Sequence, residues 1–293
     1  MKRLAALGWI LALAALPQVS YAAKATTKPA AATQIQYGPE SGQYGVYFPG
    51  GPATVLLLHE LGYPAESLEK QAEQLRKAGF TAITLEWETV RETYGLKHTW
   101  PELTSQIAEA VEYIRENAAV LGIDPNRIAM VGGSRGANLA MLTALKLNAA
   151  VPGTIKAVVS LSGDTDVPAQ IERNKEKLER HEEASQKTVK KISKAYGCWL
   201  ELTLCNMSYV DEWSPYNLVT ETSAGHVAPP MLLAASLNEE YTADWEDQQP
   251  MAEALESKGV AAETFIPVGG HGFEYWGGVK TRALSFLAAH DGL

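Results

Sequence analysis

Short apolar segments alternate with longer amphipathic segments along most of the chain. The run Thr54–Leu58 (TVLLL) is almost wholly apolar, which is typical of a strand buried on both faces. Elsewhere apolar residues recur every three or four positions, as in Leu68, Ala72 and Leu75, and this spacing indicates helices. The predicted strands cover 54–58, 81–85, 127–131, 155–161, 231–235 and 262–267, and the predicted helices cover 67–78, 101–120, 137–147, 244–257 and 280–289.

Repeated strand–helix units favour the α/β class, with a mostly parallel central sheet and helices on both faces. The chain has 293 residues, of which 46% are hydrophobic and 20% charged, so it is long enough for a large core. We assign residues 34–293 to this domain. In such sheets ligands bind at the carboxyl ends of the strands, where we look for chemistry.

Residues 166–226 interrupt the alternation. They contain a charge-dense helical stretch, Glu172–Lys194, and then several apolar residues around Cys198 and Cys205. One interpretation is a solvated helix followed by a looped excursion. The other is an inserted lid over the active site, because long insertions in compact domains are usually functional.

The N-terminus has the layout of a secretory signal peptide. Lys2 and Arg3 precede an apolar run, Leu4–Leu16, and small residues at Ser20 and Ala22 fit a cleavage site. We therefore predict a signal peptide over 1–22, a flexible leader over 23–33, and a periplasmic or secreted protein without stable membrane insertion after cleavage. The alternative is an uncleaved membrane anchor.

Export changes the interpretation of the two cysteines. In an oxidising compartment, Cys198 and Cys205 are expected to form one disulfide, which would pin the lid; the alternative is two free buried thiols. Two cysteines alone do not favour a zinc site, so no metal is expected. The formal net charge is −9 and no Lys/Arg cluster is present, which argues against nucleic acid as a partner.

The segment Gly132–Gly136 (GGSRG) matches G-x-S-x-G. It directly follows a predicted buried strand and precedes a predicted helix, as a nucleophile elbow requires. Glycines beside Ser134 suit a sharp turn, and the following helix N-terminus favours developing negative charge. The alternative is a glycine-rich turn that only packs closely or binds a phosphate, but the spacing of a Rossmann or P-loop motif is absent. Ser134 is therefore the predicted nucleophile.

A serine nucleophile needs a base, and His271 is the predicted one. It lies in Gly269–Phe273 (GGHGF), between the last predicted strand and the last predicted helix. This places it at the same edge of the sheet as Ser134. The other histidines lie in the charged helix, near the C-terminus, or in loops without a partner pattern.

The third member of a triad is an acid that orients the histidine. In chain order it falls between the serine and the histidine, in the loop after the penultimate strand, and Glu239 is our choice. Glu240 and Asp244 are nearby alternatives, and Asp164 is a more distant one.

The loop His59-Glu60-Leu61-Gly62 follows the first strong strand, where a hydrolase of this kind places half of its oxyanion hole. A backbone N–H there and that of Arg135 would converge on the oxyanion. His59 is expected to be a structural residue of this loop. Glu60 is either a surface acid or a hydrogen-bonding partner near Ser134.

With these residues placed, the sequence resembles the α/β-hydrolase superfamily over residues 44–290. The loop 59–62 approximates the His-Glu-x-x-Gly form of dienelactone hydrolase relatives, and 270–273 also looks like that group. The run 122–128 (GIDPNRI) is similar to acyl-esterase and prolyl-oligopeptidase-like domains. The resemblance implies Leu61 and Arg135 as the oxyanion-hole donors. The chain departs from dienelactone hydrolases proper, which have a cysteine nucleophile, and its inserted segment is longer and more charged.

The sequence thus predicts an exported serine hydrolase that cleaves small-molecule acyl esters through an acyl-serine intermediate, without a cofactor. A peptidase, a thioesterase or a lactonase would use the same triad, because fold and triad fix acyl transfer but not the acyl group. A non-catalytic binding protein on the same scaffold is the alternative from another class.

Overall fold

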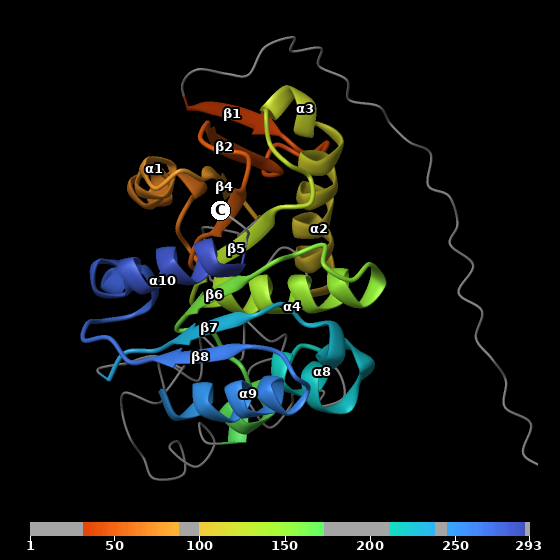
Figure 1. Ribbon diagram of the computed structural model, residues 1–293, viewed down its shortest axis with the longest axis vertical. Coiled ribbons are helices and arrows are strands. Elements are labelled where there is room, and N and C mark those ends of the chain that lie inside the picture. The colour runs from red at the N-terminus through yellow and green to blue at the C-terminus, as the bar shows by residue number, and fades with distance from the viewer. Residues whose placement is uncertain (1–31, 88–99, 173–210, 238–244, 291–293) are drawn as a thin grey trace, which may run out of the picture.

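The computed structural model describes residues 32–87, 100–172, 211–237 and 245–290. Within these ranges the centre of the molecule is an eight-stranded sheet with the order β1-β2-β4-β3-β5-β6-β7-β8 (Figure 1). The strands are β1 Thr33–Gln36, β2 Tyr44–Phe48, β3 Thr54–Leu58, β4 Thr81–Leu85, β5 Ile128–Gly133, β6 Val158–Leu161, β7 Met231–Ala234 and β8 Ala262–Phe265.

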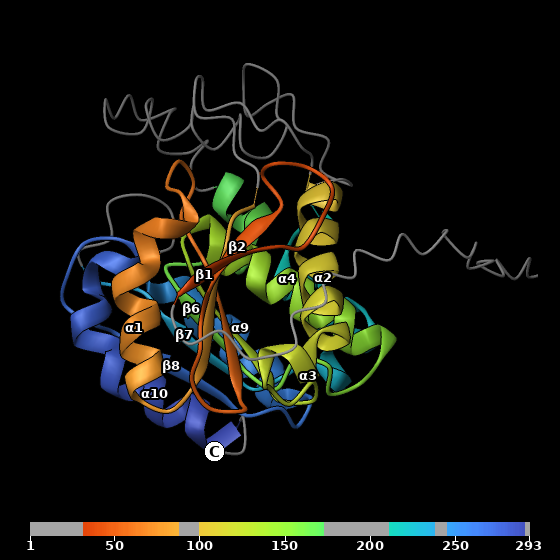
Figure 2. The same cartoon turned by 90° about the horizontal axis from the view of Figure 1, so that it is seen from above.

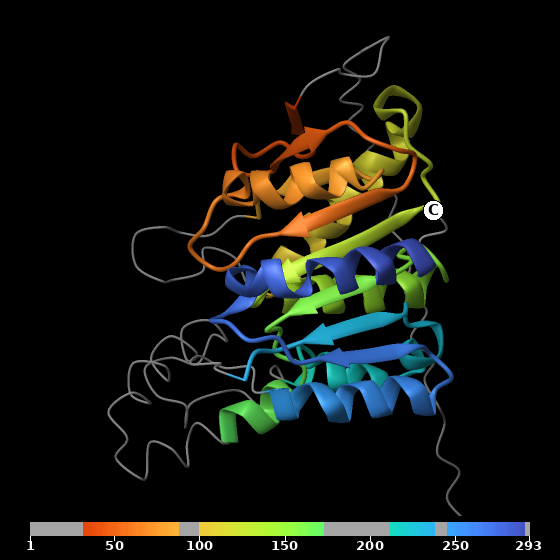
Figure 3. The same ribbon diagram turned by 60° about the vertical axis from the view of Figure 1, so that its left-hand side comes forward.

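Strands β4, β3, β5, β6, β7 and β8 are neighbours in this order and run parallel. At the other edge, β1 pairs antiparallel with β2, and β2 pairs antiparallel with β4. The register aligns Leu58 with Gly132, Gly133 with Leu161, and Leu161 with Ala234. The parallel strands therefore end together at one edge of the sheet (Figure 3). The residues that follow β3, β5, β6, β7 and β8 meet at this edge.

Helices cover both faces of the sheet (Figure 2). One face packs against α1 and α10, and the other packs against α2, α4, α8 and α9. This arrangement confirms the predicted α/β class. The helices are α1 Glu69–Lys77, α2 Trp100–Glu116, α3 Ala118–Leu121, α4 Arg135–Ala150, α8 Pro215–Glu221, α9 Trp245–Ser257 and α10 Trp276–His290, with 3-10 turns η1 Ala65–Leu68, η3 Ser223–Val227 and η4 Gly272–Tyr275.

The main differences from the sequence prediction lie at the antiparallel edge and in the second helix. Strands β1 and β2 were not predicted, and Thr33, the last residue of the predicted leader, begins β1. The predicted helix 101–120 is divided at Asn117 into α2 and α3. The Asn117 amide donates to the carbonyl oxygen of Tyr113 at 2.8 Å, so its side chain binds the backbone where the helix is interrupted.

Thr165, directly before the predicted insertion 166–226, lies beside Tyr216, which is within the later part of that insertion. The backbone N–H of Tyr216 donates to the carbonyl oxygen of Thr165 at 2.9 Å. Beyond this junction α8 and η3 pack on α4, and Lys146 Nζ lies 3.9 Å from the ring centroid of Trp213. The chain thus leaves the helical layer and re-enters it at nearly the same point.

Several predictions fall outside the described residues. They concern the signal peptide over 1–22, most of the leader, and the disulfide between Cys198 and Cys205. Among the described helices, none is long and apolar enough to cross a membrane.

Candidate active site

Ser134 occupies a sharp turn between β5 and α4. Its backbone has φ 52° and ψ −118°, which is an unusual conformation for a residue with a side chain. The Ser134 N–H donates to the carbonyl oxygen of Leu161 at 2.7 Å, which ties the turn to the end of β6. The serine is half-buried at the carboxyl edge of the sheet. This is the geometry of a nucleophile elbow.

The glycines of the motif have steric reasons to be glycine. A Cβ on Gly132 would run into the backbone of Gly136 and Ala137, and a Cβ on Gly136 would run into the carbonyl oxygens of Leu58 and His59. The turn brings its own backbone and the end of β3 too close for side chains. The pattern G-x-S-x-G is therefore a packing requirement of this turn.

The loop after β3 is held from within by His59, which is fully buried and stacks on Trp87 at 4.8 Å between ring centroids. His59 Nδ1 lies 2.8 Å from the carbonyl oxygen of Glu60. Since a carbonyl can only accept, Nδ1 is the donor. This burial fits the structural role expected for His59. Leu61, the predicted oxyanion-hole residue of this loop, is half-buried and packs on the core.

His271 follows β8 and directly precedes η4. It is half-buried, and its N–H donates to a Glu274 carboxylate oxygen at 2.9 Å. The next two amides are also bound: Gly272 N–H donates to Ser162 Oγ at 3.1 Å, and Phe273 N–H donates to Glu60 Oε1 at 2.7 Å. The loop that carries the predicted base is thus fixed by residues from two other strand ends.

The structure brings the loops of Ser134 and His271 into contact. A Cβ on Gly133 would lie 2.6 Å from the ring of Phe273 and 3.0 Å from Glu60 Oε1. The residue before the predicted nucleophile therefore packs against the residue two positions after the predicted base. The loop after β3 meets both of them through Glu60.

Of the four candidate triad acids, Asp164 is among the described residues. Glu239, Glu240 and Asp244 lie outside the described residues. Asp164 is described, and its buried carboxylate lies 3.4 Å from Arg135 Nη1 and accepts from Gln170 Nε2 at 2.7 Å. Asp164 is thus engaged by the side chain of the residue that follows Ser134.

Sequence analysis did not identify Ser162 and Tyr275 as parts of this region. Ser162 has φ 52°, is almost fully buried, and follows β6 directly. Its signal in the sequence is a serine–glycine pair at the end of a predicted strand. That signal is too common to select it without the strand order.

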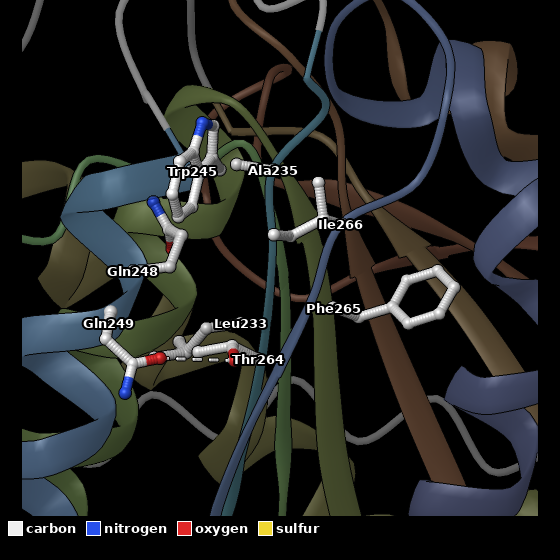
Figure 4. Close-up of a pocket in the computed structure, with 8 residues that line it drawn as sticks. All are labelled: Leu233, Ala235, Trp245, Gln248, Gln249, Thr264, Phe265 and Ile266. Atoms are coloured by element: carbon white, nitrogen blue, oxygen red, sulfur yellow. Dashed lines mark hydrogen bonds between the residues drawn. The ribbon is translucent and has the colours of Figure 1, made fainter.

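A small cavity lies beside this region, between α9 and the ends of β7 and β8. Its volume is about 50 Å³, which is room for only a few atoms. Figure 4 shows the residues around it, with the ring of Phe265 pointing away from the others. The lining residues are Leu233, Ala235, Trp245, Gln248, Gln249, Thr264, Phe265 and Ile266.

In the described part of the chain, no group of three His, Cys, Asp or Glu side chains is arranged to hold a metal ion.

Fold and strand-end loops together define an α/β-hydrolase. The family model that matches is BD-FAE, over residues 59–239, and the chain belongs to the BD-FAE family. Esterase LipQ of Mycobacterium tuberculosis is 30% identical over 103 residues, which are 35% of this chain and 22% of LipQ. The match thus spans about a fifth of the length of that relative.

Solved esterases share the fold. A truncated carbohydrate esterase from gut microbiota has a TM-score of 0.67 at 16% identity, with 92% of this chain and 99% of that chain covered. A thermostable esterase from Pseudomonas putida has a TM-score of 0.66 at 18% identity, with 89% and 83% covered. Esterase Est2 of Thermogutta terrifontis has a TM-score of 0.63 at 16% identity, with 89% and 91% covered. The predicted α/β-hydrolase fold is confirmed.

Proposed function

We propose that this protein is a serine hydrolase that cleaves carboxylic esters through an acyl-serine intermediate. The observation that carries the proposal is the strained turn at Ser134, packed against the loop of His271 at the carboxyl edge of the sheet. A strained backbone conformation persists only where the surrounding structure enforces it, and such positions cluster at active sites.

In the proposed reaction, Ser134 Oγ attacks the ester carbonyl while His271 takes the hydroxyl proton. The N–H groups of Leu61 and Arg135 stabilise the oxyanion of the tetrahedral intermediate, and α4, which begins at Arg135, adds the positive end of its dipole. His271 returns the proton to the leaving alcohol, which leaves the acyl group on Ser134. A water molecule then attacks the acyl carbonyl while His271 takes its proton, and His271 returns that proton to Ser134 Oγ as the acid leaves. Glu239 orients His271.

The comparisons support an ester as the substrate. LipQ and the three solved relatives are named as esterases, and one structure of the Thermogutta enzyme is described as phosphorylated by paraoxon. A small-molecule acyl ester is therefore the proposed substrate class. A peptide, thioester or lactone would meet the same nucleophile, so the activity panel has to include these bonds.

The nucleophile is tested by labelling with a fluorophosphonate probe. We expect the native protein and Ser257→Ala to be labelled, because Ser257 lies at the end of α9, away from the elbow. Ser134→Ala is expected to lose both the label and the hydrolysis of p-nitrophenyl acetate. Label that persists in Ser134→Ala would remove Ser134 as the nucleophile, and a native protein that takes no label would favour a binding protein.

The substrate bond is tested with p-nitrophenyl esters of graded acyl length beside aminoacyl amides, a thioester and a lactone. We expect the esters to give the highest kcat/KM. A higher kcat/KM for the amides would replace the esterase assignment by a peptidase while leaving the site unchanged.

We also propose that the protein is exported to the periplasm or beyond, on the basis of the sequence over 1–22 alone. Expression of the full chain in a Gram-negative host, fractionation and N-terminal sequencing test this. The expected product is soluble outside the cytoplasm and begins at Ala23. A protein that stays membrane-bound and retains Met1 would indicate an anchor.

A further inference from the structure

Three consecutive backbone amides of the histidine loop each donate to a side-chain oxygen. The acceptors come from different parts of the fold: Glu274 from the same loop, Ser162 from the end of β6, and Glu60 from the end of β3. The bond to Glu274 is exposed, the bond to Glu60 is partly buried, and the bond to Ser162 is buried. An amide shielded from solvent that loses its acceptor has little water to replace it, so the contacts with Ser162 and Glu60 matter most.

Ser162 belongs to a chain of hydrogen bonds with a defined direction. Its Oγ lies 2.9 Å from the hydroxyl of Tyr275, and that hydroxyl donates to the carbonyl oxygen of Ala234 at 2.9 Å. Tyr275 has one hydroxyl proton, so Ser162 donates to Tyr275 and keeps its lone pairs for the N–H of Gly272. The ends of β6 and β7 are thereby connected to the residue directly after His271.

Glu60 fills a space that two glycines leave open. A Cβ on Gly133 would lie 3.0 Å from Glu60 Oε1, and a Cβ on Gly272 would collide with the same oxygen. Gly272 also has φ 53°, a conformation that suits glycine. One carboxylate oxygen is therefore enclosed by the residue before Ser134, the residue after His271 and the N–H of Phe273 that it accepts.

We propose that Glu60 and Ser162 are positioning residues that hold the His271 loop against the nucleophile elbow. The proposal rests on the proposed function, because it assumes that His271 must lie within reach of Ser134. Neither residue is required to touch the substrate. What each supplies is a hydrogen-bond acceptor for a loop amide, and for Glu60 the acceptor, not the negative charge, is the necessary feature.

This distinction defines the variants. Glu60→Gln keeps a side-chain oxygen at the same length, whereas Glu60→Met keeps the length and removes the acceptor. Ser162→Gly removes the hydroxyl and suits the backbone φ of 52°, so it avoids the strain that Ser162→Ala retains. Glu66→Met is the matched control, since Glu66 is an exposed carboxylate whose described partner is the hydroxyl of Tyr44.

The readouts are kcat and KM for p-nitrophenyl acetate, the rate of fluorophosphonate labelling, and the thermal unfolding midpoint. A loop shifted by about 1 Å can lower a rate by about 100-fold, so we expect kcat to fall by about 10- to 100-fold in Glu60→Met and Ser162→Gly. Positioning of a base affects chemistry more than substrate binding, so KM should stay within about threefold. Glu60→Gln and Glu66→Met should retain kcat within about threefold of the native value.

Two outcomes would overturn the proposal. One is native kcat in folded Glu60→Met and Ser162→Gly. The other is a loss in Glu60→Gln as large as in Glu60→Met, which would make the charge the necessary feature. If Glu60→Met does not fold, the test rests on Ser162→Gly. Its kcat is then calculated per molecule of protein that reacts with the fluorophosphonate probe. Failure of the proposed function is separate, because it would appear as native activity in Ser134→Ala.

Discussion

The guanidinium of Arg135 lies 3.4 Å from the carboxylate of Asp164, and both side chains are buried. Arg135 is the first residue of α4, and Asp164 follows the end of β6. The second carboxylate oxygen accepts from Gln170, in the helical residues 167–172. This pair joins the turn of the predicted nucleophile to the point where the chain enters the predicted insertion.

The pair predicts a stability defect in Asp164→Ala. The substitution leaves a buried guanidinium without this carboxylate, and breaking a buried pair typically costs about 3–5 kcal/mol of unfolding free energy. Urea unfolding at pH 7 measures this loss. Hydrolysis by the folded fraction should stay within about tenfold of the native value, because the ion pair supports the elbow and does not orient His271 in the proposed mechanism.

A second variant, Asp164→Asn, separates Asp164 from the other candidate acids. Removing the acid of a serine triad lowers kcat by about 10⁴-fold, and we expect this loss for Glu239→Gln. A stable Asp164→Asn protein with a loss of that size would make Asp164 the triad acid. The comparison uses kcat normalised to fluorophosphonate-labelled protein, so unfolded molecules do not contribute.

Gly133→Ala tests the contact between the two candidate loops. The added Cβ would lie 2.6 Å from the Phe273 ring, closer than real contacts allow, so the ring or the loop that carries it has to shift. We expect a loss of about 1–3 kcal/mol in stability and a lower kcat. Gly277→Ala in α10 is the control, since among the described residues nothing beyond its own stretch of helix lies within 4 Å of the added Cβ, and helical alanine is favourable. Equal kcat in both variants would contradict the contact.

Parallel strands and the elbow could be predicted from local pattern. Strands β3 and β4 begin and end at the predicted residues. A short strand buried on both faces is a nearly continuous apolar run, which is easier to delimit in a sequence than an alternating pattern. The elbow could be located because glycines mark positions where backbones meet. The edge strand β1 could not, since it is short and Ile35 is its one buried residue.

The support of the histidine loop depends on strand order, which local pattern does not contain. Ser162 reaches Gly272, 110 residues away, because β6 lies next to β7 and the loop after β8 returns across both strand ends. Glu60 reaches Phe273 across 213 residues because β3 lies next to β5 and the parallel strands end at the same edge of the sheet. Sequence analysis could place Glu60 near Ser134 but could not identify the amide that it accepts.

His59→Phe tests how the loop after β3 is held. Phenylalanine keeps an aromatic ring beside Trp87 but removes the donor to the carbonyl oxygen of Glu60, which a fully buried His59 supplies. The carbonyl oxygen still accepts from the N–H of Tyr63 at 3.2 Å, so the variant loses one hydrogen bond, worth about 0.5–1.5 kcal/mol, and the thermal midpoint should fall slightly. In the proposed mechanism Leu61 follows this carbonyl, so kcat should fall as well, with little change in KM. An unchanged kcat in a folded variant would argue against Leu61 as an oxyanion-hole donor.

Tyr47→Phe tests the predicted pH dependence of stability at the edge of the sheet. Tyr47 is fully buried on β2, and its hydroxyl donates to the carbonyl oxygen of Leu121 at 2.6 Å. Burial raises the pKa of Tyr47 from 10.0 to about 12. Between these values the unfolded chain releases the proton and the native protein keeps it, so native stability falls as pH rises. The slope approaches about 1.4 kcal/mol per pH unit.

At pH 8 the Tyr47→Phe variant should be less stable than the native protein by about 1 kcal/mol, the contribution of one hydrogen bond. Urea unfolding at pH 8, 10 and 11 should show this difference shrinking at pH 10 and vanishing or reversing at pH 11, and a constant difference would contradict the raised pKa.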